Sequence, residues 1–186
     1  SVYPFPSIAF TAAFNAGVAR WAGETLCLEG HWDPDVPRRV PWAIAAFLLL
    51  RRAAYAQAGG FGAERFMYAE DLDLGWRLRL RGWCTRYEPA AHVEHESAAS
   101  TTAAWGEERT VRWQAATYDW IRRTRGDAYA RTVYALNVGG AAARARGDDW
   151  RAQRARGWLD THRRAWREPA PQPSSAAAAS SPSRTA

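Results

Sequence analysis

The stretch "MYAEDLDLGWRLRLRGW", residues 67–83, places Glu70, Asp71 and Asp73 within four positions and continues with leucines, arginines and tryptophans. The apolar residues recur at helical spacing, which predicts an amphipathic helix that begins near Glu70 or Asp71 and ends at about Arg81. The next residue is a glycine, which tolerates the left-handed conformation common at helix ends. The fold around this helix decides whether its crowded carboxylates have a chemical role.

The carboxylates allow two interpretations. Backbone dipoles favour negative charge at a helix start, so Glu70 and Asp71 can be present only to satisfy the first turn. The preceding segment, "GGFGAERFMY" at residues 59–68, is marked by glycines and aromatics, which indicates a shaped turn that delivers the carboxylates to a particular place. A second polar cluster follows a predicted strand; its members are His92, Glu94, His95 and Glu96. If the helix start and the strand end meet at one sheet edge, a carboxylate and an imidazole share a cleft.

The elements on either side of this helix are expected to be short. The run "VPWAIAAFLLLRR", residues 40–52, is continuously apolar up to its arginines and predicts a strand buried on both faces, with a helix as the open alternative. "AAYAQAGGF", residues 53–61, predicts a short helix closed by Gly59 and Gly60. "CTRYEP" and "AAHVEHES", divided by Pro89, predict short strands or extended segments. The region before the apolar run is interrupted by prolines and is expected to be loop with short elements.

The net charge of +6 is concentrated in the second half of the chain. Residues 1–102 carry 10 arginines against 11 acidic residues, whereas residues 103–167 carry 14 arginines against 7. The second region is rich in alanine and arginine and predicts helices over about 104–125, 127–147 and 148–166, broken at Gly126 and at "RGDD". Residues 168–186 are rich in proline, serine and alanine without an apolar pattern, and we expect a disordered tail.

Composition limits the class of protein. Hydrophobic residues make up 47% of the chain and include 11 tryptophans, which is too aromatic for a disordered protein. The two cysteines, Cys27 and Cys84, form no CxxC motif, so neither a disulfide framework nor a zinc ribbon is expected. No stretch has the pattern of a signal peptide or the length of a membrane span. We therefore expect a cytoplasmic protein, with contact with the inner face of the membrane left open.

The basic second half has three interpretations. A solvated helix surface is the simplest. A basic helical module that binds nucleic acid is an alternative function, but no nucleic-acid motif is present and acidic residues interrupt the basic stripe, so nucleic acid is not expected as a partner. An anionic membrane surface is the third, with a lipid interface formed by Trp113, Trp120 and Ile121 and by Arg122, Arg123 and Arg125.

Residues 40–100 resemble the acceptor-side, C-terminal half of glycosyltransferase family 2 enzymes, in particular those similar to rhamnosyltransferases. Family members have a Trp before a strand that ends in paired arginines, a Gly-Gly-Phe turn, Phe-Met-Tyr, an acidic pair, and Tyr-x-Pro with a histidine six residues after the proline. The matching residues here are Trp42, Arg51, Arg52, Gly59, Gly60, Phe61, Phe66, Met67, Tyr68, Glu70, Asp71, Asp73, Leu74, Arg77, Leu78, Gly82, Trp83, Tyr87, Pro89 and His95. The implied fold is α/β: part of a Rossmann-like GT-A domain over residues 1–102 with a short sheet and helices, followed by an α-helical region.

The resemblance implies inverting transfer of a sugar from a nucleoside diphosphate to the hydroxyl of a saccharide or lipid-linked acceptor, in cell-surface polysaccharide synthesis. It makes Asp71 the base that takes the hydroxyl proton and Glu70 its support. Asp73 and Arg77, four residues apart, are expected to pair across one helical turn. Trp42 and Tyr68 are expected to contact the acceptor or support the site. The resemblance further implies a divalent metal, Mn or Mg, with His95 as a ligand.

The sequence departs from the family pattern at Gly62, where an Asp is usual, and at Ala45, where Gly is common. The family's nucleotide-binding half, with its Asp-x-Asp motif, has no counterpart. "DPD" at Asp33–Asp35 follows no buried strand and predicts a proline turn. We therefore expect a fragment that has negligible transferase activity alone and that exposes apolar surface along Trp42–Leu50.

Overall fold

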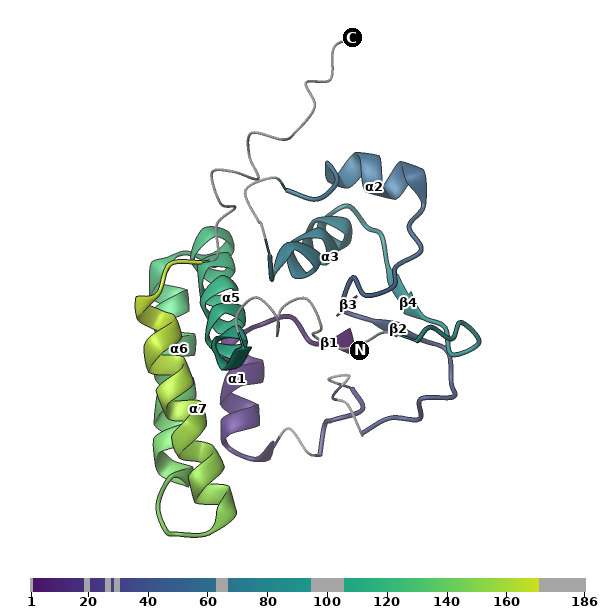
Figure 1. The fold of residues 1–186 in the computed structure, drawn as a ribbon. Helices are drawn as coiled ribbons and strands as arrows, with labels where there is room; N and C mark the ends of the chain where they lie inside the picture. The colour runs from purple at the N-terminus through teal and green to yellow at the C-terminus, as the bar shows by residue number, and fades with distance from the viewer. Residues whose placement is uncertain are drawn as a thin grey trace.

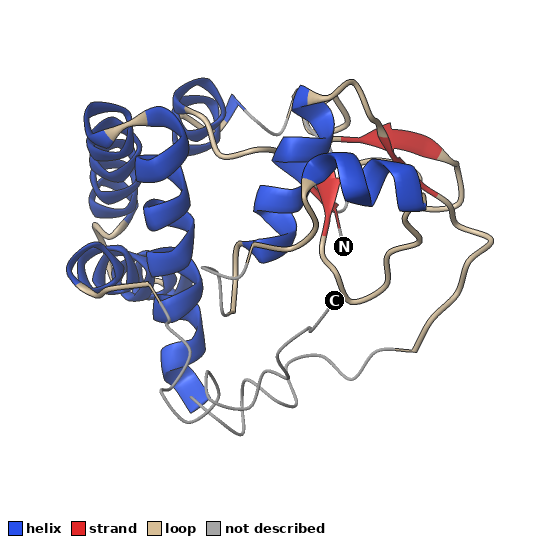
Figure 2. Cartoon of the chain, turned by 90° about the horizontal axis from the view of Figure 1, so that it is seen from above, coloured by secondary structure: helices blue, strands red, loops and turns tan. Residues whose placement is uncertain are grey.

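The computed structural model describes residues 2–18, 21–25, 28, 31–62, 67–94 and 106–170. These residues form a mixed α/β structure with six α-helices and two small sheets, in agreement with the predicted class (Figures 1 and 2). The long helices of the second half stand together on one side of the molecule, and the short strands lie on the other (Figure 1). The predicted catalytic helix lies between them.

Each sheet has two antiparallel strands. β1 (Val2–Tyr3) pairs with β3 (Trp42–Ala43), and β2 (Arg38–Val40) pairs with β4 (Thr85–Tyr87). β4 confirms the strand predicted in "CTRYEP". The extended segment predicted after it forms no strand over residues 90–94, and its later residues lie outside the described part of the chain.

The prediction of a long buried strand over residues 40–52 is wrong. Only Trp42–Ala43 is a strand, and residues 45–47 form a turn. A strand buried on both faces needs hydrogen-bonding neighbours, and in the described part of the chain the two residues of β1 are the only partner of β3. The apolar side chains that follow are consequently open to solvent: Phe47 is 57% exposed and Leu49 is 94% exposed. This is the apolar exposure expected along the run, although Trp42 itself is buried.

The two helices that follow the apolar run agree with the sequence. α2 (Arg52–Ala58) ends at Gly59, whose φ of 77° is the left-handed conformation that glycine tolerates. α3 (Glu70–Leu80) is the helix predicted from the opening stretch. α3 packs closely on β3, since a Cβ atom added at Gly75 would lie 2.7 Å from the Cβ atom of Trp42. A glycine at this position therefore sets how close the carboxylate-bearing helix lies to the strand.

Four helices make up the other side of the molecule. α1 (Ile8–Asn15) starts at Ser7, whose hydroxyl accepts from the Phe10 backbone N–H at 3.1 Å. A short 3-10 helix, η2 (Gly106–Glu108), leads into α5 (Arg109–Arg125), which is followed by α6 (Asp127–Arg144) and α7 (Trp150–Arg167). The predicted breaks at Gly126 and "RGDD" are confirmed, and the helix ends differ from the expected ones by a few residues. Residues 171–186 of the predicted tail lie outside the described residues.

One apolar core joins the helices to the predicted catalytic region. It contains Trp42 and Leu72 from the first half together with Trp120 and Ile121 from α5. Trp120 and Ile121 are 0% exposed. The predicted lipid interface at these two residues is therefore wrong, because their side chains hold α5 against α3. Among the described residues, none of the helices combines the length and the apolar character that a bilayer crossing requires.

Candidate active site

The turn before α3 has an unusual backbone. Tyr68 and Ala69 have φ angles of 66° and 62°, and both lie in the left-handed region that non-glycine residues rarely occupy. Such strain persists only where the surrounding structure fixes it, and it is concentrated at functional sites. Ala69 is 4% exposed and Tyr68 packs against the apolar core. Packing therefore stabilises a turn that sets the direction in which Glu70 and Asp71 leave the chain.

Asp71 connects this turn to the loop after β3. Its Oδ1 atom accepts from the Leu72 backbone N–H at 2.8 Å, as the helix-start interpretation expects. Its Oδ2 atom accepts from the backbone N–H of Ala45 at 3.1 Å, a contact that no feature of the sequence indicates. Burial raises the pKa of the Asp71 carboxyl above its ordinary value, and these backbone hydrogen bonds offset part of the effect. A half-buried carboxylate with a raised pKa is a better proton acceptor than an ordinary one.

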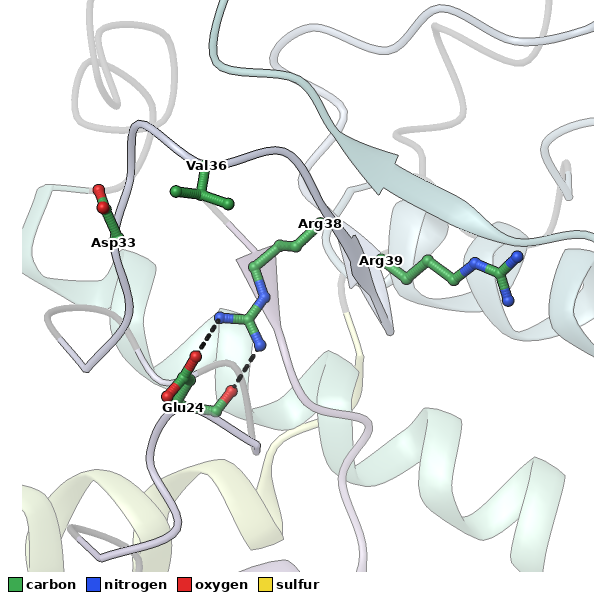
Figure 3. Close-up of a pocket in the computed structure, with 5 residues that line it drawn as sticks. All are labelled: Glu24, Asp33, Val36, Arg38 and Arg39. Carbon is green, nitrogen blue, oxygen red and sulfur yellow. Dashed lines mark hydrogen bonds and ion pairs between the residues drawn. The ribbon is translucent and has the colours of Figure 1, made fainter.

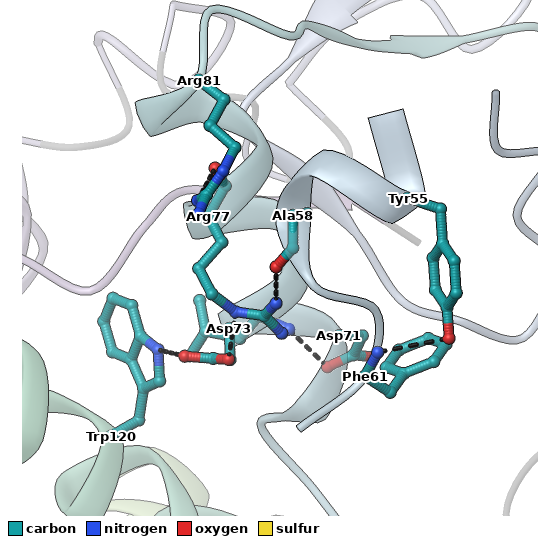
Figure 4. A network of polar contacts seen from close by, with 9 residues as sticks. Tyr55, Ala58, Phe61, Asp71, Asp73, Arg77, Arg81 and Trp120 are labelled. Atoms are coloured by element: carbon teal, nitrogen blue, oxygen red, sulfur yellow. Dashed lines mark hydrogen bonds and ion pairs between the residues drawn. The ribbon is translucent and has the colours of Figure 1, made fainter. Parts of the chain in front are cut away.

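The Asp73 carboxylate is buried and bonded to neighbouring side chains. Arg77 Nε donates to its Oδ2 at 2.8 Å, so the predicted pairing across one turn is confirmed, and Trp120 Nε1 donates to its Oδ1 at 3.1 Å (Figure 4). Arg77 also donates to the carbonyl oxygen of Ala58, which ties α3 to α2. Asp73 is 7% exposed and both of its oxygens have donors, so it ties α3 to α5, while its partner Arg77 ties α3 to α2. The bond from Trp120 crosses 47 positions of sequence, a separation that a helical pattern cannot reveal.

The glycine turn directly after α2 is held by aromatic residues. The backbone N–H of Phe61 donates to the Tyr55 hydroxyl oxygen at 3.2 Å, and the two ring centroids are 6.0 Å apart (Figure 4). A Cβ atom at Gly60, which has a φ of 68°, would lie 3.1 Å from the Tyr55 ring. This glycine, which is part of the quoted Gly-Gly-Phe pattern, therefore permits both the backbone angle and the close ring.

Trp42, which was expected to contact the acceptor or to support the site, lies in a supporting position. It is 5% exposed, its Nε1 atom donates to the Pro4 carbonyl oxygen at 3.2 Å, and its ring lies 5.6 Å from that of Tyr3. Glu70 and Tyr68 are both half-buried at the start of α3. Trp42 therefore stabilises the strand on which α3 packs, and Asp71 is half-buried like Glu70 and Tyr68.

The predicted metal ligand, His95, lies outside the described residues, so the structure does not relate it to Asp71. The neighbouring His92 and Glu94 are exposed. Within the described part of the chain, no three His, Cys, Asp or Glu side chains come together as a metal site would require.

Two shallow cavities of about 350 Å³ lie away from the carboxylates, beside β2. Glu24, Asp33, Val36, Arg38 and Arg39 line the first, where Arg38 donates to the Glu24 backbone oxygen at 2.9 Å (Figure 3). Asp33 accepts from the Asp35 backbone N–H at 2.9 Å, which confirms the predicted turn at "DPD". Arg38 and Arg39 also line the second cavity, together with Arg79 and Trp83. The sequence analysis did not predict Arg38 and Arg39 as site residues. The feature that could have indicated them is their position directly after the proline turn at "DPD".

The segment that contains Glu70, Asp71 and Asp73 is similar to known proteins. Residues 37–116 match the family described as glycosyltransferase like family 2. The chain is 50% identical over 64 residues to N-acetylglucosaminyl-diphospho-decaprenol L-rhamnosyltransferase of Mycobacterium tuberculosis, which covers 34% of the chain and 21% of that protein. It is 32% identical over 127 residues to rhamnosyltransferase WbbL of Escherichia coli, which covers 67% of the chain and 45% of that protein. The chain thus spans about a fifth of the first relative and less than half of the second. No solved structure matches the chain.

Proposed function

We propose that the chain forms the acceptor side of an inverting rhamnosyltransferase. The premise is that residues 37–116 match glycosyltransferase like family 2 and that the chain is similar to two rhamnosyltransferases. A sugar passes from a nucleoside diphosphate to the hydroxyl of a saccharide or lipid-linked acceptor, in cell-surface polysaccharide synthesis. The Mycobacterium tuberculosis relative is named for a diphospho-decaprenol acceptor and for L-rhamnose, and these names supply the substrate class.

In this proposal Asp71 is the general base. The acceptor hydroxyl gives its proton to the Asp71 carboxylate while its oxygen bonds to the anomeric carbon, and the bond from that carbon to the diphosphate breaks on the opposite face. Each Asp71 oxygen accepts one backbone N–H, and a carboxylate oxygen has two acceptor positions, so a hydroxyl can still be bound. The observation that carries the proposal is the position of this carboxyl, within the matched segment, next to a strained turn and hydrogen-bonded to the loop after β3. Burial there raises the pKa of the carboxyl, which favours its role as a proton acceptor. Glu70, its neighbour in the first turn, supports Asp71 in this role.

Asp73 has a different role. Its side chain is buried at 7% exposure and its oxygens accept from Arg77 and Trp120, so in this proposal it positions the helix that carries Asp71. The first experiment compares Asp71→Asn with Glu70→Gln in a transferase-competent protein that contains this chain. Loss of a general base lowers kcat by about 10²- to 10⁴-fold, and we expect this for Asp71→Asn with a smaller effect for Glu70→Gln. Wild-type kcat in Asp71→Asn would refute the assignment.

The nucleotide-binding part of the enzyme is proposed to lie outside these 186 residues. The exposed Phe47 and Leu49 side chains beside β3, and the share of the relatives that the chain spans, support this. Transfer measured with the 186-residue chain alone and with an N-terminally extended version separates the two cases. We expect negligible transfer by the chain alone, and equal activity of both proteins would contradict the proposal.

A divalent metal, Mn or Mg, remains part of the proposal, with His95 as a ligand. When bound, such an ion neutralises charge that develops on the leaving diphosphate. The test is manganese binding, measured by calorimetry, to the extended protein and to its His95→Ala variant, with His92→Ala as the matched control. Binding that is lost only in His95→Ala supports the assignment, and equal binding by both variants overturns it.

A further inference from the structure

One end of the helical side of the molecule carries large apolar side chains that are exposed to solvent. Phe14, Val18 and Trp21, at and after the end of α1, are 53%, 55% and 81% exposed. Trp150, the first residue of α7, is 64% exposed. Single exposed apolar residues are ordinary, but large side chains gathered at one end of a molecule mark an interaction surface.

Hydrogen bonds bring these two distant segments together. Arg144, the last residue of α6, donates to the backbone oxygen of Asn15 at 3.1 Å and to its Oδ1 atom at 2.9 Å. The end of α1 therefore lies beside the end of α6, from which the chain turns into α7, and Figure 1 shows both at the lower end of the molecule. We call this surface, formed by Phe14, Val18, Trp21 and residues 144–156, the α1/α7 end.

The α6–α7 corner is held in a fixed shape. Arg156 donates to the carbonyl oxygens of Ala145 and Gly147 at 2.9 and 2.8 Å. Asp149 caps α7 by accepting from the Ala152 backbone N–H at 2.8 Å. Because the corner is built in advance, binding through Trp150 would require little ordering of the chain.

The charge at this end is positive. Residues 144–156 contain five arginines and two aspartates, Asp148 and Asp149, which gives a net charge of +3. The guanidinium of Arg151 lies over the Trp150 ring, 5.4 Å from its centroid. Tryptophan is favoured at the boundary between lipid headgroups and acyl chains, and neighbouring arginines bind the phosphates above it.

We propose that the α1/α7 end is a docking surface for an anionic phospholipid bilayer, with Trp21 and Trp150 inserted at the headgroup level. Arg146, Arg151 and Arg154 bind lipid phosphates around them. This surface differs from the one expected at Trp120 and Ile121, which are buried. The inference goes beyond sugar transfer, and its test does not depend on transferase activity.

The test is co-sedimentation of the 186-residue chain with vesicles of phosphatidylcholine alone and of phosphatidylcholine with phosphatidylglycerol. We expect binding to the anionic vesicles that weakens in high salt. The variants Trp21→Ser with Trp150→Ser, and Arg146→Gln with Arg151→Gln and Arg154→Gln, should each lower the partition coefficient roughly tenfold or more. All of these side chains are exposed, so the melting temperature should not change, and this is measured in parallel.

Matched controls remove similar groups elsewhere. Phe47→Ser with Leu49→Ser deletes apolar side chains of comparable exposure beside β3, and Arg52→Gln with Arg81→Gln and Arg86→Gln removes three exposed charges. Both controls should bind as the unaltered chain does. No binding to anionic vesicles, equal binding to neutral ones, or an equal loss in the controls would each overturn the proposal.

Discussion

Acid should loosen the helical side of the molecule through His162. This residue of α7 is 9% exposed, and its Nδ1 atom lies 2.9 Å from the hydroxyl oxygen of Tyr118 on α5. Asn137 on α6 donates to the same oxygen at 3.2 Å. The Tyr118 hydroxyl and the neutral His162 ring share one hydrogen bond, whose direction depends on the tautomer of the ring. Burial, with the charge of Arg144 as a second cause, lowers the pKa of His162 to about 4.

The size of this stability loss follows from the difference between the pKa of His162 in the folded chain and in the unfolded chain. The unfolded chain protonates this histidine near pH 6.5 and the folded chain near pH 4, so the unfolded state binds more protons between these values. Stability contributed by the neutral imidazole is therefore present above pH 6.5 and is lost as the pH falls toward 4. The two pKa values correspond to roughly 3 kcal/mol in full, of which about 2 kcal/mol is lost between pH 6.5 and pH 5.

Urea unfolding followed by circular dichroism at pH 7 and pH 5 measures this loss. His162→Asn keeps a hydrogen-bonding group in place of the imidazole but cannot gain a proton. The loss of unfolding free energy between pH 7 and pH 5 should therefore be smaller in this variant than in the unaltered chain, by about 2 kcal/mol. The exposed His92→Asn variant is the matched control and should lose as much stability as the unaltered chain. The same loss in His162→Asn as in the unaltered chain would refute the reasoning.

Two further substitutions test how α3 is held. Gly75→Ala places a Cβ atom 2.7 Å from that of Trp42 and should lower the free energy of unfolding by about 1–3 kcal/mol. Gly139→Ala is the matched control, because a Cβ atom there meets nothing within 4 Å, and it should raise the free energy of unfolding by roughly 0.5–1 kcal/mol. Urea unfolding measures both, and equal effects would contradict the close packing. Asp73→Ala removes the acceptor of two buried donors and should lower the free energy of unfolding by about 3 kcal/mol. Asp160→Ala breaks an exposed pair of the same spacing and should lower it by less than about 1 kcal/mol, and similar losses in the two variants would refute the structural role of Asp73.

The helices were predictable because their signals are local. Apolar spacing, a glycine at the end of α2, and the breaks at Gly126 and "RGDD" each act within a few residues. The pairing of Asp73 with Arg77 was predictable for the same reason, since residues four apart on a helix face each other.

Contacts between distant segments were not predictable. The bond from Ala45 to Asp71, the bond from Trp120 to Asp73 and the bonds from Arg144 to Asn15 depend on how elements pack, and no spacing encodes them. The apolar run failed as a strand prediction for a related reason, because a strand forms only where another strand supplies hydrogen bonds. Its composition predicts burial in a sheet, and the described residues provide only a two-residue partner.

The role of Asp71 as general base is tested most directly by titrating its carboxyl group in the transferase-competent protein, followed by carbon-13 NMR. The midpoint of this titration is compared with the pH dependence of kcat/KM. A general base must be deprotonated, so a raised pKa makes activity fall as the pH drops through that value. The account predicts a midpoint above 3.8 that coincides with the acidic limb of kcat/KM. A midpoint at or below 3.8, or an acidic limb that is unchanged in Asp71→Asn, would contradict it.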